Sequence, residues 1–239
     1  TSVNADAITL APRSWPSCPS FAMKILGFSP QVINTSSISN KYICSYKNTK
    51  DRIENPCNLL FVGRVCFDKG IRELLNALKV LNMSKHKTYL LKLVGPVGDL
   101  DGSTINDFIY DNKVEKYVEY HGSIQFGPKL FEYYKKSDIY ILPSYHEGMP
   151  KTIWESMANG TPVIASKIDG IKDNFTDNEN LIFIKPRSVN SIVAAVQKIN
   201  NSNSLFLKLI KNGIAKSKNY TSENQANQII KKINEKYGL

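Results

Sequence analysis

Six short apolar runs, separated by segments with helical periodicity, constrain the fold of this 239-residue chain most strongly. The runs are rich in β-branched and aromatic residues, which is typical of buried strands. They occupy residues 58–63, 89–95, 117–120, 138–142, 162–165 and 181–184. Between the first two runs, leucine and isoleucine recur at positions 71, 74, 75, 78 and 81, the spacing of an amphipathic helix. The alternation predicts an α/β fold, a Rossmann-like parallel six-stranded sheet with helices on both faces.

One strand–turn–helix segment, YHEGMPKTIWESMANG at residues 145–160, carries the most chemistry. Gly148 and Pro150 indicate a tight turn after the fourth apolar run, and Pro150 is expected at the first position of a helix. Gly160 is expected to cap the carboxyl end of that helix. The segment therefore presents two carboxylates eight positions apart, Glu147 in the loop and Glu155 in the helix.

The edge of a parallel sheet beyond the carboxyl ends of its strands is where ligands bind in this class of fold. The free backbone amides from Lys151 to Ile153 suit a phosphate. Glu147 would face the group attached to that phosphate, and Glu155 would accept hydrogen bonds from vicinal hydroxyls such as those of a ribose. The alternative is that Glu147 is an ordinary loop acid and Glu155 a solvated helix acid.

A second loop at the same edge carries two cations. Gly63 ends the first apolar run, and Arg64 and Lys69 flank the loop that leads into the first amphipathic helix. An arginine and a lysine there can neutralise a diphosphate, although loop cations are often only solvent-exposed. His121 and Gly122 follow the third run, where a lone histidine is more often structural than catalytic.

The stretch EGMPKTIWESMANGTPVIAS is similar to the E-x7-E motif of retaining glycosyltransferases of the GT-B fold, the group 1 or family 4 type. GR-x4-KG resembles the diphosphate-binding pair of the same family. The resemblance implies that Arg64 and Lys69 stabilise the departing diphosphate, that Glu147 contacts the donor sugar and that Glu155 holds the donor ribose. It implies that the remaining substrate contacts come from the loop residues Gly63, His121, Gly122, Gly148, Met149, Pro150, Lys151 and Thr152.

In that family such a chain is the C-terminal, donor-binding half of the enzyme. Residues 1–57 would be a remnant of the N-terminal domain plus a polar linker, with strands at 7–11 and 31–34 and a short helix at 14–27. Residues 58–239 would bind the donor. One departure from the family pattern is the missing glycine between Asn180 and Leu181, which alters a loop near the donor edge.

The resemblance implies transfer of a sugar from a nucleotide-diphosphate sugar, with UDP as the expected nucleotide, to a hydroxyl of a glycan or lipid-linked acceptor. The acceptor would bind through the N-terminal domain that is missing from this sequence. No cofactor or metal is expected, because Arg64 and Lys69 supply the positive charge and the nucleotide sugar is itself a substrate.

The charge and the cysteine content of the chain bear on its cellular compartment and on its partners. The net charge is +10, and the chain from Ser188 onward contributes eight lysines against two glutamates. Such a surface attracts anionic lipid, nucleic acid or nucleotide, or is simply solvated. Four cysteines without C-x-x-C spacing indicate reduced thiols and no zinc site. These features favour a cytoplasmic protein without a nucleic-acid partner. Peripheral contact of this protein with the inner face of the membrane stays an open alternative.

Two other interpretations stay open. The chain could be the donor-binding subunit of a split glycosyltransferase whose acceptor domain is a separate polypeptide. It could also be a non-catalytic relic of the GT-B fold that acts as an interaction protein. The presence of Arg64, Lys69, Glu147 and Glu155 together argues against the relic, which would be free to lose such groups.

Overall fold

The computed structural model describes residues 38–237 apart from residue 85. The chain divides into two units, Thr1–Thr35 and Ser36–Leu239, and the description that follows concerns the second. The strands expected at 7–11 and 31–34 and the helix expected at 14–27 lie outside the described residues.

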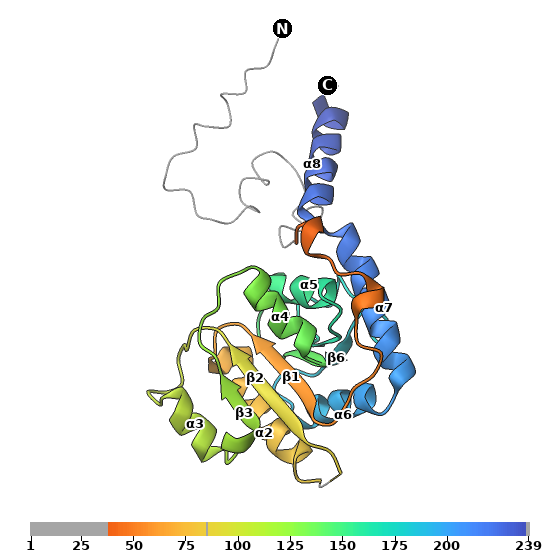
Figure 1. Ribbon diagram of the computed structural model, residues 1–239. Coiled ribbons are helices and arrows are strands. Elements are labelled where there is room, and N and C mark those ends of the chain that lie inside the picture. Colours follow the sequence, from red (N-terminus) through yellow and green to blue (C-terminus); the bar gives the residue numbers. More distant parts are fainter. Residues whose placement is uncertain (1–37, 85, 238–239) are drawn as a thin grey trace. The chain divides into compact units, whose positions relative to one another are not determined.

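The core is a six-stranded sheet in the order β3-β2-β1-β4-β5-β6 (Figure 1), and all of its pairings are parallel. This arrangement confirms the predicted Rossmann-like α/β fold. The strands match the six apolar runs to within a residue or two, and they are β1 (Cys57–Val62), β2 (Tyr89–Val94), β3 (Val118–Tyr120), β4 (Ile139–Leu142), β5 (Val163–Ser166) and β6 (Ile182–Ile184). Every residue of β4 and β5 is buried, because helices cover both faces of a parallel sheet.

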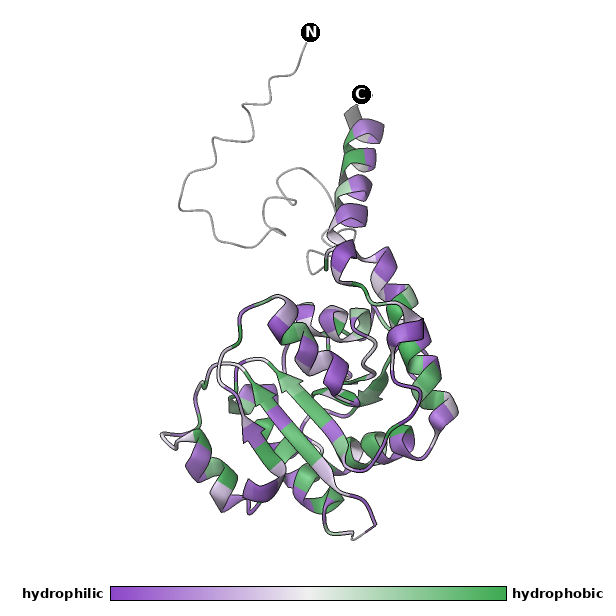
Figure 2. Cartoon of the chain, viewed as in Figure 1, coloured by the Kyte–Doolittle hydropathy of each residue, from purple (hydrophilic) through white to green (hydrophobic). Residues whose placement is uncertain are grey.

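Five helices connect or follow the strands: α2 (Ile71–Leu81), α3 (Ile105–Asp111), α4 (Pro128–Lys136), α5 (Lys151–Ala158) and α6 (Val189–Asn200). Two longer ones, α7 (Asn203–Asn219) and α8 (Ser222–Tyr237), follow in the sequence. Helix α2 packs with α6, and α5 packs with α4 and α7. Hydrophobic residues concentrate on the strands and on the helix sides that face them, whereas the outer surfaces are mostly hydrophilic (Figure 2). None of the helices in the described part of the chain is long and apolar enough to span a bilayer.

The order of the strands creates a switch point between β1 and β4. The chain runs from β1 outward through β2 to β3, and it then returns to the other side of β1 to form β4, β5 and β6. The loops that leave β1 and β4 therefore open in opposite directions. In open α/β sheets this is where ligands bind.

The boundaries of α5 correct one expectation and confirm another. Pro150 is not the first helical residue; it is the N-cap, with an extended backbone (φ −71°, ψ 124°), so the helix begins at Lys151. Gly160 caps the other end as predicted. With φ +74°, it donates to the Met157 carbonyl at 3.1 Å, and Thr161 donates to the Ser156 carbonyl at 3.0 Å. These two bonds form a Schellman motif.

Residues 38–56, which are polar and were expected to form a linker, lie against the helices of the domain. Ile38 is buried and pairs with Thr221. The Cys44 amide donates to the Ala158 carbonyl at 2.8 Å. Lys50 contacts the buried carboxylate of Asp138 at 2.6 Å. The Cys44 hydrogen bond brings the segment to the carboxyl end of α5.

Candidate active site at the carboxyl edge of the sheet

Lys69 and Glu147 meet at the switch point. The Lys69 Nζ lies 2.7 Å from Oε1 of Glu147, and the two side chains are only 17% and 14% exposed. The Ser144 hydroxyl donates to the same carboxylate oxygen at 2.8 Å. Lys69 ends the short 3₁₀ helix η5 (Phe67–Lys69) after β1, whereas Glu147 lies in the loop after β4. The structure thus brings into one ion pair two residues that the sequence predicted as separate parts of the site, Lys69 for the diphosphate and Glu147 for the donor sugar.

Close backbone approaches hold these loops together. The Tyr145 amide donates to the Asp68 carbonyl at 2.8 Å. Gly70 has φ +72°, and a Cβ there would lie 2.2 Å from the Pro143 carbonyl oxygen. Gly170, in the loop after β5, has φ +82°, and its Cβ would lie 1.7 Å from the Gly148 carbonyl oxygen. Only glycine permits both the backbone conformation and the contact at these two positions.

Tyr145 is a site residue that the sequence interpretation missed. Its hydroxyl donates to Oε2 of Glu73 on α2 at 2.8 Å, and the Arg187 guanidinium lies 4.5 Å from the centre of its ring. Burial, followed by the hydrogen bond and the charge of Glu73, raises the pKa of Tyr145 to about 12. The neutral phenol therefore connects three segments beside Glu147. Only its position two residues before Glu147 could have suggested this.

Arg64 extends from the end of β1 along a neighbouring loop. It is exposed, and a Cβ at Gly98 would lie 2.9 Å from both its Cγ and its Cδ. The guanidinium therefore belongs to the same edge of the sheet as Lys69. It does not take part in the Lys69–Glu147 ion pair.

Glu155 is buried one helical turn into α5. The residue is 6% exposed, and its Oε2 accepts a hydrogen bond from the Tyr134 hydroxyl of α4 at 2.9 Å. Burial raises the pKa of Glu155, and the hydrogen bond from Tyr134 opposes that rise. These contacts exclude the alternative of a solvated helix acid.

The amino end of α5 lies beside the same loops. Its N-cap residue, Pro150, supplies no side-chain hydrogen bond, so the first amides of the helix have no side-chain cap. The Thr152 hydroxyl, in the first turn, donates a hydrogen bond to the Tyr140 hydroxyl oxygen at 2.7 Å. Tyr140 in turn donates to the Val62 carbonyl at 3.3 Å, which ties the start of α5 to the end of β1. Met149 packs partly buried against the core, and Lys151 is exposed.

The loops after β1, β2 and β3 are joined through their backbones. The Gly95 amide donates to the Gly122 carbonyl at 2.8 Å, and a Cβ at Gly95 would lie 1.9 Å from the Gly63 carbonyl oxygen. The His121 imidazole instead lies 3.2 Å from Glu119 and packs edge-on against Tyr133 at 5.0 Å. The structure therefore brings the backbones of Gly63 and Gly122 together, and it directs the His121 side chain to Glu119 and Tyr133.

The described residues contain no group of three or more histidine, cysteine, aspartate or glutamate side chains that could hold a metal ion. The polar groups of this edge include the cations Arg64 and Lys69, the carboxylates Glu147 and Glu155, and the amides at the amino end of α5. That combination can bind an anion that carries hydroxyl groups.

Three comparisons place the chain among known proteins. The putative teichuronic acid biosynthesis glycosyltransferase TuaC of Bacillus subtilis is 26% identical over 188 residues, which cover 74% of this chain and 43% of that protein. Anabaena Alr3699/HepE in complex with UDP is similar in structure, with a TM-score of 0.71 and 18% identity over 90% of this chain and 61% of that one. The C-terminal domain of the group 1 glycosyl transferase LpcC from Francisella tularensis has a TM-score of 0.62 and 22% identity, over 80% of this chain and 97% of that domain.

The chain spans about a third to a half of the length of the curated relatives it matches. The model of the family described as glycosyl transferases group 1 matches residues 45–216, which include every predicted site residue. The chain therefore belongs to the group 1 family of glycosyl transferases.

Proposed function

We propose that the protein transfers a sugar from a UDP-linked donor to a hydroxyl of a glycan or lipid-linked acceptor in polysaccharide synthesis, and that residues 58–239 hold the donor. The observation that carries this proposal is the Lys69–Glu147 pair at the switch point, beside the amino end of α5. The polysaccharide role of TuaC and the UDP bound to HepE support the choice of pathway class and nucleotide.

Lys69 and Arg64 would neutralise the diphosphate of the donor. In the structure Lys69 is paired with Glu147 at 2.7 Å. The Glu147 carboxylate thus occupies the position beside Lys69 that a phosphate of the donor would take. When a phosphate takes this place, Glu147 is released to accept a hydrogen bond from a hydroxyl of the donor sugar. The two cations then stabilise the negative charge that grows on the diphosphate as the sugar leaves.

Glu155 would bind the ribose. One carboxylate oxygen is already occupied by Tyr134, so the second oxygen, Oε1, is the acceptor for the ribose hydroxyls. Hydrogen bonds to the ionised form favour that form, so nucleotide binding should lower the pKa that burial has raised. The amides of Gly148, Lys151 and Thr152 would complete the diphosphate site, with Met149 and Pro150 shaping the turn and Gly63, His121 and Gly122 lining the base through their backbones.

Retention of the anomeric configuration is proposed from the E-x7-E resemblance, and we assign no covalent nucleophile. We also propose that the reaction needs no metal, because Arg64 and Lys69 supply the charge that a divalent cation would otherwise provide. The acceptor would bind to a further domain. Peripheral contact with a membrane would follow from a lipid-linked acceptor.

Calorimetric titration of the chain with UDP, GDP and a UDP-sugar tests the proposal. UDP should bind, and Arg64→Ala or Glu155→Ala should each weaken binding by a factor of about ten or more, equivalent to about 1.4 kcal/mol. Arg52→Ala is the matched control, because Arg52 is also exposed but lies before β1, at the opposite edge of the sheet. Removal of divalent cations should leave the UDP affinity unchanged. Equal losses in Arg52→Ala and Arg64→Ala, or tighter binding of GDP, would contradict the proposal.

A further inference from the structure

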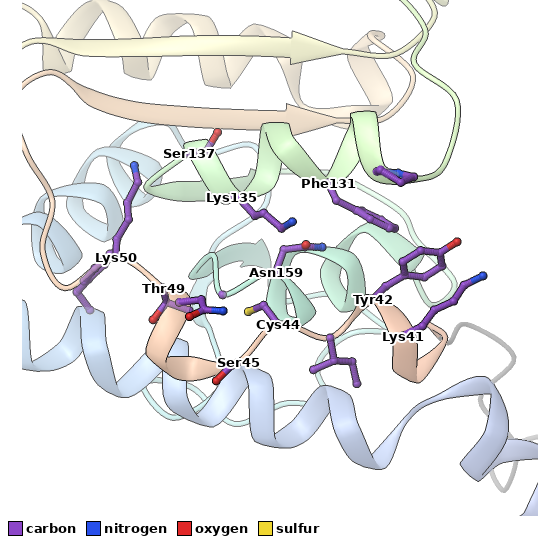
Figure 3. A pocket seen from close by; sticks show the side chains of 15 residues that line it. Lys41, Tyr42, Cys44, Ser45, Thr49, Lys50, Phe131, Lys135, Ser137 and Asn159 are labelled. Atoms are coloured by element: carbon purple, nitrogen blue, oxygen red, sulfur yellow. The ribbon is translucent and has the colours of Figure 1, made fainter.

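A second polar cavity lies at the opposite end of α5 from the candidate active site. Its volume is about 480 Å³, which is within the range of small-molecule sites, roughly 300–1,000 Å³. Residues 41–50 form one wall, and α4, the carboxyl end of α5 and α7 form the others (Figure 3). It has no lining residue in common with the set predicted to bind the donor.

The lining of this cavity is positively charged. Lys41, Lys50 and Lys135 contribute to it, and among its described lining residues there is no aspartate or glutamate. Lys50 forms an ion pair with Asp138 at 2.6 Å, and Lys135 forms one with Glu132 at 3.3 Å. Neither of these two carboxylates lines the cavity. Lys41 lies 4.8 Å from the centre of the Tyr42 ring. Lys41 and Lys135 are both exposed and can turn to an anion.

Asn159 lines the same cavity and carries an unsatisfied acceptor. The residue is only 4% exposed. Its Nδ2 donates to the Glu155 carbonyl at 2.8 Å, whereas its buried Oδ1 has no hydrogen-bond partner within the described part of the chain. Its side chain points into the cavity toward Lys135 (Figure 3). A buried acceptor without a donor is costly, so a ligand hydroxyl placed there would be stabilising.

Two aromatic side chains in the walls of the cavity suit contact with the ring of a ligand. The Tyr42 and Phe131 side chains both line the cavity, with their ring centres 4.7 Å apart. Ser45 and Thr49 add hydroxyl groups to the lining, away from the two rings (Figure 3). Cations, an unpaired amide oxygen and aromatic faces together match a compact ligand with one charged end and a hydroxylated, partly apolar body.

We propose that this cavity binds a phosphorylated sugar, with the phosphate between Lys41 and Lys135 and a sugar hydroxyl donating to Oδ1 of Asn159. The site is separate from the donor site, so both can be occupied at once. The proposal does not depend on the identity of the donor.

Calorimetric titration of the 239-residue chain with glucose 6-phosphate, in the presence of saturating UDP, tests this site. Saturable binding is expected, and it should be weakened at least about fivefold by Lys41→Gln and by Lys135→Gln, which is roughly 1 kcal/mol each. Lys136→Gln is the matched control, since it removes the same charge from the next position of α4 but does not line the cavity. Thermal unfolding of each variant verifies that the exposed substitutions leave the fold intact.

Titrations with inorganic phosphate and with glucose distinguish a sugar-phosphate site from a general anion or sugar site. Each of these ligands should bind more weakly than glucose 6-phosphate, because each lacks one half of the recognised group. Absence of saturable binding, equal loss in Lys136→Gln, or displacement of glucose 6-phosphate by UDP would overturn the proposal. A chain that fails to bind UDP but binds glucose 6-phosphate would disprove the donor site and leave this one standing.

Discussion

The Nζ of Lys69 lies 2.7 Å from Oε1 of Glu147, although 78 positions separate the two residues. The pair closes the switch point between β1 and β4, and both side chains are largely shielded from water. A shielded, hydrogen-bonded ion pair contributes more to the free energy of unfolding than an exposed one, because solvent screens it less.

Replacing Lys69 should therefore affect both stability and binding. Lys69→Met leaves Glu147 without its cation, and UDP should bind at least about tenfold more weakly. A double-mutant cycle of Lys69→Met with Glu147→Gln, measured by urea unfolding, should give a coupling energy of about 1 kcal/mol. The exposed Lys172–Asp169 pair, at a similar 2.6 Å separation, is the control and should show no measurable coupling. Equal coupling in the two cycles would argue that the Lys69–Glu147 pair has no special environment.

Tyr134 should stabilise the domain through Glu155. Its hydroxyl is buried and donates to the carboxylate at 2.9 Å, so Tyr134→Phe leaves a buried acidic group with one partner fewer. Urea denaturation should show a loss of about 1–3 kcal/mol. Tyr133→Phe, on the same helix but only half-buried, should change the free energy of unfolding by less than about 0.5 kcal/mol. Similar losses in both variants would show that the Tyr134–Glu155 bond contributes little.

The raised pKa of Glu155 predicts a pH dependence of stability. Between its ordinary value of 4.5 and the higher pKa of the folded state, the folded protein holds a proton that the unfolded chain has lost. Stability from this group is therefore present at low pH and is lost as pH rises through that window. Glu155→Gln lacks the effect, so its stability relative to the parent chain should increase between about pH 4.5 and about pH 7.5. Urea unfolding of both proteins at the two pH values measures this difference, and a pH-independent difference would refute it.

Gly170 should be essential to the loop that carries Glu147. Gly170→Ala would force a Cβ to within 1.7 Å of the Gly148 carbonyl oxygen, so the loop must move. Gly102 is the matched control, because its φ of +80° nearly equals the +82° of Gly170 and nothing lies within 4 Å of its Cβ position. Both alanines incur the left-handed strain of about 1–2 kcal/mol. Only Gly170→Ala should also weaken UDP binding, and equal effects of the two variants on binding would contradict the role of the close contact.

Much of the fold could be predicted from the sequence because parallel strands buried on both faces appear as continuous apolar runs. The run at 138–142 and the strand Ile139–Leu142 agree closely for this reason. Helix boundaries were harder to place. Pro150 fits both the N-cap and the first helical position by its fixed φ, and only its ψ of 124° decides between them.

The candidate site was predictable only where the local pattern carries the chemistry. Glu147, Glu155, Arg64 and Lys69 follow strands or begin helices, so the topology alone brings them to one edge of the sheet. The contact of Tyr145 with Glu73 was not predictable, because it joins residues 72 positions apart. The unpaired oxygen of Asn159 likewise depends on burial, which spacing in the sequence does not specify.

Backbone amide chemical shifts, followed by NMR during titration with UDP, test the central claim most directly. The account predicts saturable shifts that are largest for the amides of Gly148, Lys151 and Thr152 and for the loop at residues 63–70, with residues 41–50 nearly unaffected. Lys69→Met should reduce these shifts at the same UDP concentration. Shifts concentrated away from the carboxyl edge of the sheet, or no saturable shifts at all, would contradict a donor site at the switch point.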